Sequence, residues 1–419
     1  MGEMRNRIAA LPIRWRISCV FMVTMFVAFL DRLNISYAMP LMAAEYGWTE
    51  EQLQQYGSQL MGAFYIAYGL ANIFLTPLAA RWGTRKCLMV IIVLWAVFTA
   101  MGAFVSQFMM LFLLSRVLLG LSEGVHFPMM MTTTKAWFPP SERSRANSIV
   151  AAGIFLAALL TPFFIVPLMA EYGWRAGFHL LALIGLLISL PLVYWFVHDT
   201  PRDHPTVSAG ETETIEAALL LEASEQDNQL SLKQLILLPG FALLLFSGAA
   251  NNLIGLGLTS WFPTYFAHTR GIPFADITWL VAGPTAFSLL GVVTWAVLGD
   301  RFNQRALMTG TAAILACVAL YFALTVNGLV AVIVLFSVAV FCLSSYQASE
   351  FALLQRILPQ QKFATLAGLY NGASIIIGGG LGPYLLSPIV GSGENTWIVS
   401  LVALICGSLL LMLHRRLHY

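Results

Sequence analysis

A few charged residues lie inside stretches that are otherwise strongly apolar. Asp31 and Arg32 interrupt the apolar run that begins at Ile17, and Arg116 and Glu123 interrupt a later one. At the centre of a membrane such side chains cost about 2.5–3.5 kcal/mol on insertion scales, so they indicate a functional site. Two arginines in a cavity of low dielectric constant would bind an anion, most naturally a carboxylate, through paired N–H donors. Two neighbouring carboxylates would hold or release protons according to whether an anion occupies the arginines.

The spacing of these residues restricts their geometry. Arg116 and Glu123 are seven residues apart, which is two helical turns, so they share one helix face about 10 Å apart. Gly120 and Gly124 flank that face and would let another helix approach closely. Adjacent residues point about 100° apart on a helix, so we expect one residue of the aspartate–arginine pair to reach the cavity and the other to contact a neighbouring helix. The alternative interpretation is that all four are buried ion pairs that hold helices together.

Three further polar residues in apolar stretches leave two interpretations open. Glu350 could act in a cavity or pair with the nearby Arg356. His126 could relay protons or be a hydrogen-bonded packing residue. Asn251 could contact a substrate or form a hydrogen bond between helices.

The composition identifies the setting of these residues. In 419 residues the hydrophobic fraction is 59%, the charged fraction is 10% and the net charge is +2. A typical soluble domain has roughly 25% charged residues, and a chain that binds nucleic acid carries a basic surface. These values exclude both classes and indicate a protein of the lipid bilayer with no nucleic-acid partner. The sequence shows no metal cluster, nucleophile triad or phosphate loop, so we expect no enzyme activity, no metal and no cofactor.

Twelve stretches are long and apolar enough to span a bilayer, which takes about 20 residues each. They fall near 17–41, 56–80, 87–105, 108–133, 146–168, 176–197, 241–266, 274–299, 306–325, 329–355, 363–390 and 396–413. One long polar segment separates the sixth from the seventh. The sequence therefore predicts an all-α membrane protein with a six-helix half over 1–198, a linker over 199–238 and a second half over 239–419.

The Lys and Arg residues predict the orientation. With both termini and the linker in the cytoplasm, eighteen of the 22 basic residues lie on the inside, including Arg5 and Arg7. Arg175 and Arg270 lie outside, and the two intramembrane arginines account for the rest. This excess of basic residues on the cytoplasmic side agrees with the positive-inside rule.

The two halves also share a short segment of similar sequence. The segment from Arg81 to Arg85 follows the second span, and the segment from Arg301 to Arg305 follows the eighth, 220 residues later. Two related halves with a binding site between them are a common transporter architecture. We call the two places where these spans meet the cytoplasm the membrane corners. Asp300, Arg301 and Arg85 lie there, and we expect them to have a gating or packing role.

These segments resemble the two loop signatures of the major facilitator superfamily. More narrowly, the chain resembles its anion:cation symporter family, which includes bacterial sugar-acid permeases and vesicular glutamate and sialic-acid transporters. The segments that carry this resemblance are 30–34, 116–128, 137–143, 172–175, 261–265 and 369–372.

The resemblance implies a role for each matched residue. Asp31 and Glu123 match protonatable carboxylates, and Arg32 and Arg116 match the anion-site and gating arginines. Tyr68 and Asn371 match substrate-contacting positions, although each could also be a packed polar group. The Trp261 segment we interpret in part as an aromatic belt at the membrane interface.

Three departures from the family pattern affect the prediction. Ala80 stands where the loop signature has an aspartate, so the corner of the N-terminal half must be fastened differently, with Asp300 as the only candidate. Ile154 stands where sugar-acid members have a glutamine, so a group that would form hydrogen bonds to substrate hydroxyls is missing. Glu350 has no obvious counterpart in the family.

We therefore expect a monomeric secondary transporter of a bacterial inner membrane that moves a small organic anion together with protons by alternating access. Protons would neutralise Asp31 and Glu123, and the anion would bind Arg32 with support from Arg116. The alternative is an exporter or exchanger of an amphipathic anion, which the residue at 154 keeps open. A channel would not need two pseudo-equivalent halves.

Overall fold

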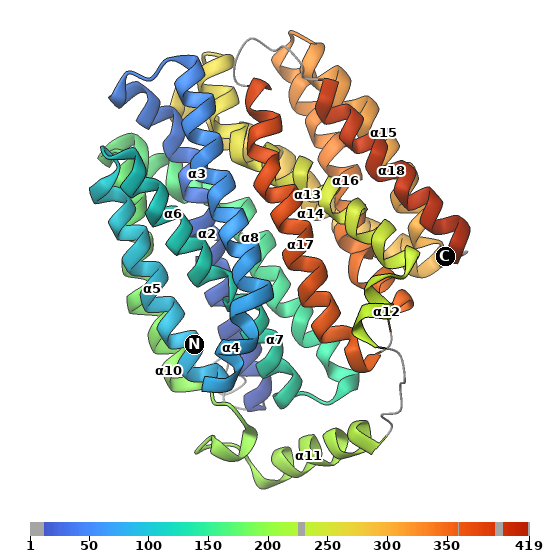
Figure 1. The fold of residues 1–419 in the computed structure, drawn as a ribbon. Helices are drawn as coiled ribbons and strands as arrows, with labels where there is room; N and C mark the ends of the chain where they lie inside the picture. Colours follow the sequence, from blue (N-terminus) through green and yellow to red (C-terminus); the bar gives the residue numbers. More distant parts are fainter. Residues whose placement is uncertain (1–11, 225–230, 359, 390–396, 418–419) are drawn as a thin grey trace, which may run out of the picture.

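The computed structural model describes residues 12–224, 231–358, 360–389 and 397–417, and every regular element within these ranges is a helix (Figure 1). Twelve of its helices, counted with their continuations, are long and apolar enough to cross a membrane. This confirms the predicted fold class. Arg5, Arg7 and residue 396, at the start of the predicted twelfth span, lie outside the described residues.

The N-terminal half consists of α2 (Ile13–Tyr46), α3 (Glu50–Leu70) with α4 (Thr76–Ala79), α5 (Thr84–Val105), α6 (Met109–Gly124) with α7 (His126–Trp137), α8 (Pro140–Tyr172) and α9 (Trp174–Ile184) with α10 (Leu190–Phe196). The C-terminal half consists of α13 (Pro239–Thr264), α14 (Ile277–Phe302), α15 (Arg305–Thr325), α16 (Leu329–Ile357), α17 (Gln360–Leu386) and α18 (Trp397–Leu417). The segment between the halves forms α11 (Ala209–Ser224) and α12 (Leu232–Ile236).

Two helices of the N-terminal half are irregular near the candidate site. The α3 helix continues through a π-helical turn, η1 (Ala71–Leu75), before α4. The fourth span breaks at Val125, directly after Glu123 and Gly124. Pro128 explains this break, because proline lacks the N–H that would bond to the carbonyl of Gly124. Irregular turns of this kind often lie at functional sites.

The α3 and α17 helices form the main contact between the halves, and glycines bring them together (Figure 1). A Cβ atom at Gly62 would lie 2.8 Å from the carbonyl oxygen of Gly380. A Cβ atom at Gly69 would lie 2.7 Å from the carbonyl oxygen of Gly372. Glycine lets helix backbones approach this closely in membranes, where the burial of apolar surface from water does not drive helices together.

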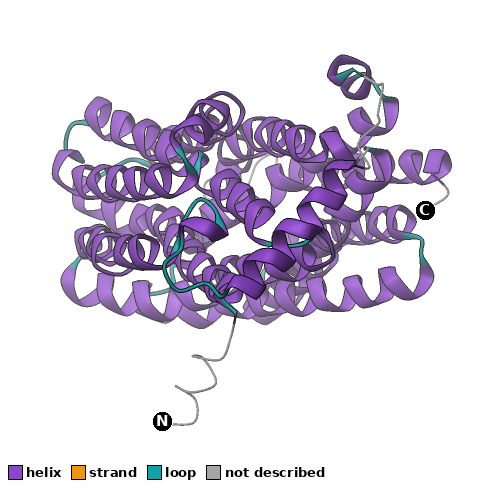
Figure 2. Cartoon of the chain, turned by 90° about the horizontal axis from the view of Figure 1, so that it is seen from below, coloured by secondary structure: helices purple, strands orange, loops and turns teal. Residues whose placement is uncertain are grey.

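The apolar core is shared at one end of the bundle and divided at the other. We call the end that carries α11 the linker end; Figure 2 views the helices from that side. At the opposite end one cluster joins both halves, with Phe178 of the N-terminal half and Phe262 of the C-terminal half among its members. At the linker end each half has its own cluster, around Trp137 in one and Tyr370 in the other. The halves therefore pack together at the opposite end and separately at the linker end.

Trp261 belongs to this packing between the halves, and our assignment of it to an interfacial aromatic belt is wrong. The residue is 1% exposed, and its indole N–H donates to the carbonyl of Pro383 at 2.8 Å. Ser58 of α3 donates to the same carbonyl at 3.0 Å. Trp261 also fills the space beside Gly57, where a Cβ atom would meet the indole ring at 2.5 Å. The indole of Trp261 is therefore buried between the two halves.

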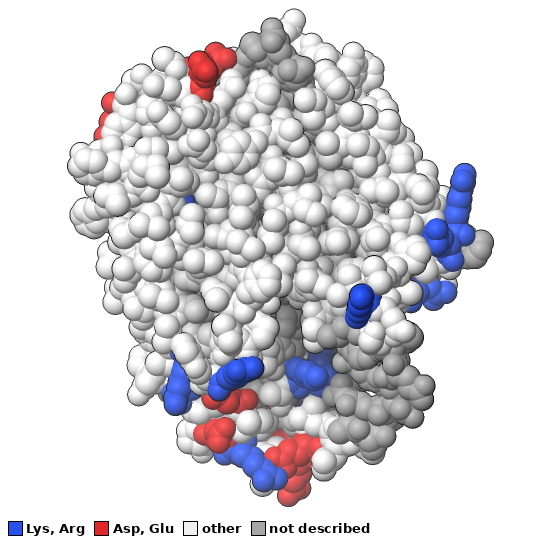
Figure 3. All heavy atoms as spheres, in the orientation of Figure 1, with Lys and Arg blue, Asp and Glu red and all other residues white. Residues whose placement is uncertain are grey.

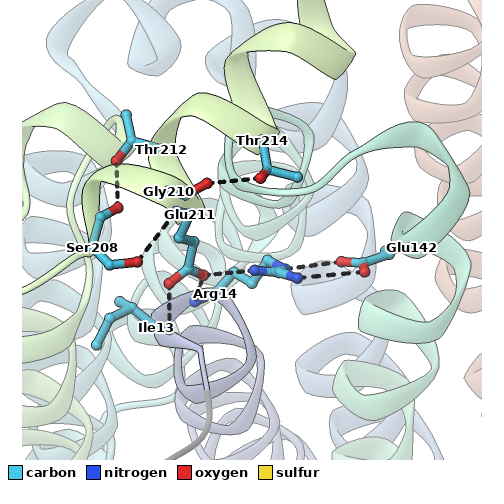
Figure 4. Close-up of polar contacts among 8 residues, drawn as sticks. All are labelled: Ile13, Arg14, Glu142, Ser208, Gly210, Glu211, Thr212 and Thr214. Carbon is cyan, nitrogen blue, oxygen red and sulfur yellow. Dashed lines mark hydrogen bonds and ion pairs between the residues drawn. The ribbon is translucent and has the colours of Figure 1, made fainter.

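The linker helix α11 is fastened to the N-terminal half by a carboxylate bridge (Figure 4). Glu211 accepts hydrogen bonds from the first backbone N–H groups of α2, at Ile13 and Arg14, with distances of 3.2 and 3.3 Å. The guanidinium of Arg14 contacts Glu211 and Glu142 of α8, each at 2.9 Å. A carboxylate is favoured at a helix N-terminus because the unpaired N–H groups and the helix dipole attract it. The segment predicted as a linker over 199–238 therefore includes a helix that docks on the N-terminal half.

On the face that Figure 3 shows, charged side chains are almost absent from the wide middle of the surface and gather toward its ends. Near the linker end the guanidinium groups of Arg14 and Arg305 pair with carboxylates, and that of Arg85 donates to the carbonyl of Tyr194. This distribution fits the spans that the sequence predicts, because long apolar stretches leave charge only at their ends.

Candidate functional site

The intramembrane charges of the N-terminal half meet in one buried cluster. Arg32 of α2 forms an ion pair with Glu123 of α6 at 3.3 Å, and the exposed fractions of the two side chains are 9% and 1%. Three aromatic rings surround the guanidinium. Its central carbon lies 4.8 Å from the ring centroid of Phe29, 5.6 Å from that of Phe64 and 4.5 Å from that of Tyr68. Such rings attract a cation through their negative faces.

Arg116 differs from Arg32 because no carboxylate holds it. The residue is 2% exposed, and within the described ranges its guanidinium forms no hydrogen bond and no ion pair shorter than 4 Å. It lies over the ring of Phe64, with 4.9 Å from its central carbon to the ring centroid. A buried cation without a hydrogen-bonded partner is costly, so this position is suited to receive an anion.

Asp31 faces a neighbouring helix. Its carboxylate accepts a hydrogen bond from the hydroxyl of Thr99 on α5, and its other oxygen has no partner among the described residues. Arg32, by contrast, lines a cavity. The structure thus shows the division that the 100° offset of adjacent residues predicts. With both acids ionised, the two arginines and two carboxylates form a cluster without net charge.

A narrow cavity, too small to admit a water molecule, lies beside the arginines. Arg32 and Arg116 line it together with Phe64 and Tyr65 of α3. Ser260 of α13 is the lining residue that the C-terminal half contributes, and its hydroxyl donates to the carbonyl of Leu256 at 2.7 Å. The cavity therefore lies where the two halves meet.

The glycines of α6 hold the aromatic wall in place. A Cβ atom at Gly120 would lie 2.4 Å from the carbonyl oxygen of Phe64, and one at Gly124 would lie 2.3 Å from that of Tyr68. Any larger residue at either position would push α3 away from α6. The close approach that their spacing predicts is therefore present, and it places the rings of Phe64 and Tyr68 against Arg32.

The other candidates lie apart from this cluster. His126 packs edge-on against Trp95, with 5.3 Å between ring centroids, and its Nε2 atom has no partner among the described residues. Asn251 is 5% exposed, and its side-chain oxygen is likewise without a partner there. The side chain of Asn371 shows no hydrogen bond to the charged cluster. Glu350 lies on α16 of the C-terminal half and forms no ion pair with a described residue.

The two membrane corners are fastened by different carboxylates. Asp300 pairs with Arg305, which also donates to the carbonyl of Ala348. Arg301 is exposed, over the ring of Phe302. At the corner of the N-terminal half, Asp199 accepts hydrogen bonds from the Thr84 hydroxyl and the backbone N–H of Arg85.

The Thr84 hydroxyl and the Arg85 backbone N–H lie 2.9 and 2.8 Å from the carboxylate oxygen of Asp199. The Arg85 side chain donates to the carbonyl of Tyr194 at 2.5 Å. Our expectation that Asp300 alone provides such a contact is therefore wrong. Asp199 supplies a carboxylate that Ala80 cannot, and it does so from a position 115 residues away from Thr84.

Several polar residues near the cluster were not singled out from the sequence. Asn34 and Asn72 are 0% and 4% exposed, and both amide atoms of each lack a partner among the described residues. Asn72 lies in the π-helical turn η1. Thr99 donates to Asp31, and Tyr65 lines the cavity together with the two arginines. The available signal was the group of aromatic residues at 64, 65 and 68, because residues four apart share a helix face.

The family model of the Major Facilitator Superfamily matches residues 21–383 and, in a second alignment, residues 265–417. The chain belongs to the Major Facilitator Superfamily. It is a multi-pass membrane protein, and the match covers both six-helix halves. Within the described residues no group of three His, Cys, Asp or Glu side chains could hold a metal ion.

Curated relatives of the chain are anion transporters, in agreement with the resemblance to the anion:cation symporters. It is 29% identical over 280 residues to a probable sulfoacetate transporter of Cupriavidus necator, an alignment that covers 67% of this chain but only 63% of that protein. It is 25% identical to a hexuronate transporter of Bacillus subtilis, with 91% and 89% covered. It is 27% identical to a probable galactarate/D-glucarate transporter of Escherichia coli, with 70% and 66% covered.

Solved structures agree on the fold. A bacterial homologue of the human lysosomal transporter Spinster, in an inward-facing and occupied conformation, superposes with a TM-score of 0.77 at 16% identity. The superposition covers 97% of this chain and 98% of that one. A D-xylose–proton symporter gives a TM-score of 0.74 at 15% identity, with 94% and 96% covered. At these identities the likeness shows the fold alone.

Proposed function

We propose that the protein is a proton-coupled symporter of a small organic anion, working by alternating access as a monomer in a bacterial inner membrane with both termini in the cytoplasm. The observation that carries this proposal is the buried Arg32–Glu123 ion pair beside the unpaired Arg116. One arginine is ready for an anion, and the other is held by a carboxylate that a proton can neutralise.

Charge balance links the anion to protons. The four-residue cluster is neutral while both acids are ionised, so an anion that entered alone would leave net negative charge in a medium of low dielectric constant. A proton on Glu123 removes that excess and frees the guanidinium of Arg32. A second proton on Asp31 would remove a further negative charge from the cluster, next to Arg116, which no carboxylate holds. The anion then binds both arginines, with Tyr68 along the wall and Asn371 reached from α17.

The surroundings of the arginines favour a compact anion with few hydroxyls. The wall next to Arg32 is aromatic, and the empty space is small. Ile154, in place of a glutamine, offers no hydrogen bond to a hydroxyl. The anions named for the relatives are sulfoacetate, hexuronate and galactarate or glucarate, and of these sulfoacetate is the smallest and has no hydroxyl group.

The division of the apolar core supports alternating access. The halves share one cluster at the opposite end and have separate clusters at the linker end, so the bundle is closed on one side of the candidate site. The orientation predicted from Lys and Arg would make the open side cytoplasmic.

Proteoliposomes with a pH-sensitive dye inside test the coupling. Sulfoacetate, a hexuronate and glucarate are added outside in turn, without an imposed proton gradient. Symport predicts that one of them acidifies the interior, that Arg116→Met abolishes this signal and that Arg415→Met, at an exposed residue of α18, does not.

Exchange is the competing outcome of the same experiment. An exchanger would take up labelled anion only when unlabelled anion is inside, and the interior would not acidify. Acidification that is equal in protein-free vesicles would also contradict the proposal. In either case the Arg116→Met variant must still reach the membrane and give a monodisperse protein, so that its loss of signal is informative.

A further inference from the structure

One hydrogen-bonded contact joins the two halves between the cavity and the opposite end of the bundle. The carbonyl oxygen of Pro383 on α17 accepts from the indole N–H of Trp261 on α13 at 2.8 Å and from the hydroxyl of Ser58 on α3 at 3.0 Å. A carbonyl oxygen has two lone pairs, so it can accept both hydrogen bonds at once. Ser58 and Trp261 are each 1% exposed, so the whole contact is buried.

The two donors come from different halves. Trp261 and Pro383 both belong to the C-terminal half, so their hydrogen bond holds α13 to α17 within that half. Ser58 belongs to the N-terminal half, so its hydrogen bond exists only while the halves are together at this end. The indole and the carbonyl therefore form a receptor surface on the C-terminal half, and the serine hydroxyl docks on it.

Gly57 lets α3 lie directly on the indole. A Cβ atom at this position would lie 2.5 Å from Cη2 of Trp261, and 3.2 and 3.3 Å from Cζ3 and Cζ2. These atoms form the outer edge of the indole, whose N–H is held by Pro383. The ring cannot swing away without losing that hydrogen bond. A side chain at Gly57 would therefore push α3 away from the C-terminal half.

The contact lies next to the candidate site, on the side of the opposite end. Ser260 precedes Trp261 on α13 and lines the cavity beside the arginines. On α3, Tyr65 lines the same cavity two turns after Ser58. The α3 helix begins at the opposite end and runs toward the linker end (Figure 1). Gly57 and Ser58 therefore lie between the cavity and the opposite end.

We propose that Gly57 and Ser58, docked on Trp261 and the carbonyl of Pro383, form the gate that closes the anion site toward the opposite end. We call these four residues the indole gate. Opening breaks the hydrogen bond of Ser58 and separates Gly57 from the indole, while Trp261 stays on Pro383. The receptor surface is then ready to receive α3 again. This inference rests on the alternating access of the proposed function, but it depends neither on the identity of the anion nor on protons.

Distances between spin labels, measured on the purified protein without any anion, test the indole gate. Labels at Glu51→Cys and Ala275→Cys, exposed positions in different halves at the opposite end, report its opening. A second pair at Lys86→Cys and Gln304→Cys reports the linker end. The two native cysteines that are not buried are replaced by alanine. The wild type should give mainly a short distance at the opposite end and a long one at the linker end.

Gly57→Ala should open the gate, because the added methyl group would collide with the indole. The opposite-end pair should move to a longer distance and the linker-end pair to a shorter one. Overpacking of this kind should raise the ratio of open to closed molecules about 5- to 100-fold. Gly255→Ala is the matched control, since a Cβ atom at that glycine of α13 would meet nothing within 4 Å.

A second substitution should reverse this opening. Trp261→Phe lacks the outer ring edge that the methyl group would meet, so the double variant Gly57→Ala/Trp261→Phe should return toward the closed distances. A general loss of helix packing would not be repaired in this way, because the second change removes still more of the buried contact.

Ser58→Ala should act in the same direction with a smaller effect. One hydrogen bond between the halves is lost, so the ratio of open to closed molecules should rise about 2- to 10-fold. The carbonyl of Pro383 keeps its hydrogen bond from Trp261 and is not left without a partner. Ser337→Ala is the matched control, because that buried hydroxyl donates within its own helix, to the carbonyl of Ile333, and both distances should stay unchanged.

The indole gate is overturned if Gly57→Ala gives the same label distances as Gly255→Ala, or if its shift persists after Trp261→Phe is added. The transport assay is a separate readout. If the variants move the distances while no anion acidifies the vesicles, the proposed symport fails and the gate is supported. If an anion acidifies the vesicles while the distances do not respond to the variants, the gate fails and the symport is supported.

Discussion

The two six-helix halves treat buried polar groups in opposite ways. The N-terminal half keeps Arg32, Arg116, Asp31 and Glu123 within one region, next to aromatic rings and the cavity. The C-terminal half contributes Ser260 to that cavity and instead contains two tyrosines, Tyr346 and Tyr370, that are hydrogen-bonded to each other beside the carbonyl of Leu244. Under the proposed function, recognition of an anion by charge is therefore concentrated in one half, and the other half joins α13, α16 and α17 through hydrogen bonds of two tyrosine hydroxyls.

This difference shows how two halves of one fold can separate their tasks. A substrate held by two arginines of the N-terminal half can remain with that half while the C-terminal half moves past it. The C-terminal half needs no ionised group for that purpose, which avoids the desolvation of a second set of charges.

Removing one member of the buried ion pair should have the largest effect. Arg32→Met leaves the Glu123 carboxylate buried without a partner, which costs about 3–5 kcal/mol when the acid stays ionised. Thermal unfolding of the purified protein at alkaline pH measures the change. The double variant Arg32→Met/Glu123→Gln should recover most of the loss. If both single variants and the double variant unfold at the wild-type temperature, the pair does not hold the half together.

Arg116→Met should separate binding from stability. Charged hydrogen bonds contribute about 1.5–3 kcal/mol each, so the affinity for a transported anion should fall roughly 10- to 100-fold. The unfolding temperature should stay near the wild-type value, because Arg116 has no partner to lose among the described residues. A variant that is strongly destabilised would indicate that Arg116 fastens helices, as the ion-pair interpretation holds.

The two corners offer a smaller comparison between the halves. Asp199→Ala removes the carboxylate that accepts from Thr84 and from the N-terminal turn of α5, a loss of about 1 kcal/mol. Asp300→Ala removes a pair whose aspartate side chain is 77% exposed, and exposed pairs contribute less than that. Chemical or thermal unfolding should therefore show that the Asp199→Ala variant is less stable than the Asp300→Ala variant. The reverse ranking would contradict the role of Asp199.

The smallest effect should be a pH dependence of the linker, which docks on the N-terminal half. Burial, with a contribution from His198, lowers the pKa of His204 from its ordinary value of 6.5. The ring of His204 packs edge-on against Trp137, with 5.7 Å between centroids. A lowered pKa means that the docked state binds fewer protons, so its stability is full above the ordinary value and falls as the pH drops below it.

Limited proteolysis of the linker across this pH range measures docking. We expect faster cleavage on acidification in the wild type. His204→Gln should remove most of the change, and a cleavage rate that does not depend on pH in the wild type would contradict the prediction.

The fold could be predicted because its main signals are local. Apolar runs and the alternation of basic residues give the number of spans directly from the sequence. The glycine contacts of α6 were also predictable, because the spacing of Gly120 and Gly124 places them on the face of Glu123. These features need only helix geometry.

The partners of the charges could not be predicted in the same way. The ion pair between Arg32 and Glu123 joins residues 91 positions apart, and the bridge from Asp199 to Thr84 spans 115. Tryptophan is a residue type that is common at the membrane interface, but Gly57 on another helix makes room for the indole of Trp261 inside the bundle. Each outcome depends on how helices pack in three dimensions, which spacing along one helix does not reveal.

The division of the apolar core also has a thermodynamic consequence. A reorientation that opened the opposite end would split its shared cluster, while the two clusters at the linker end would merge. The apolar area lost at one end would be largely regained at the other, so the free-energy difference between the two orientations is a small remainder of two large terms. A single ion pair or one bound proton, each worth a few kcal/mol, is then enough to reverse the balance.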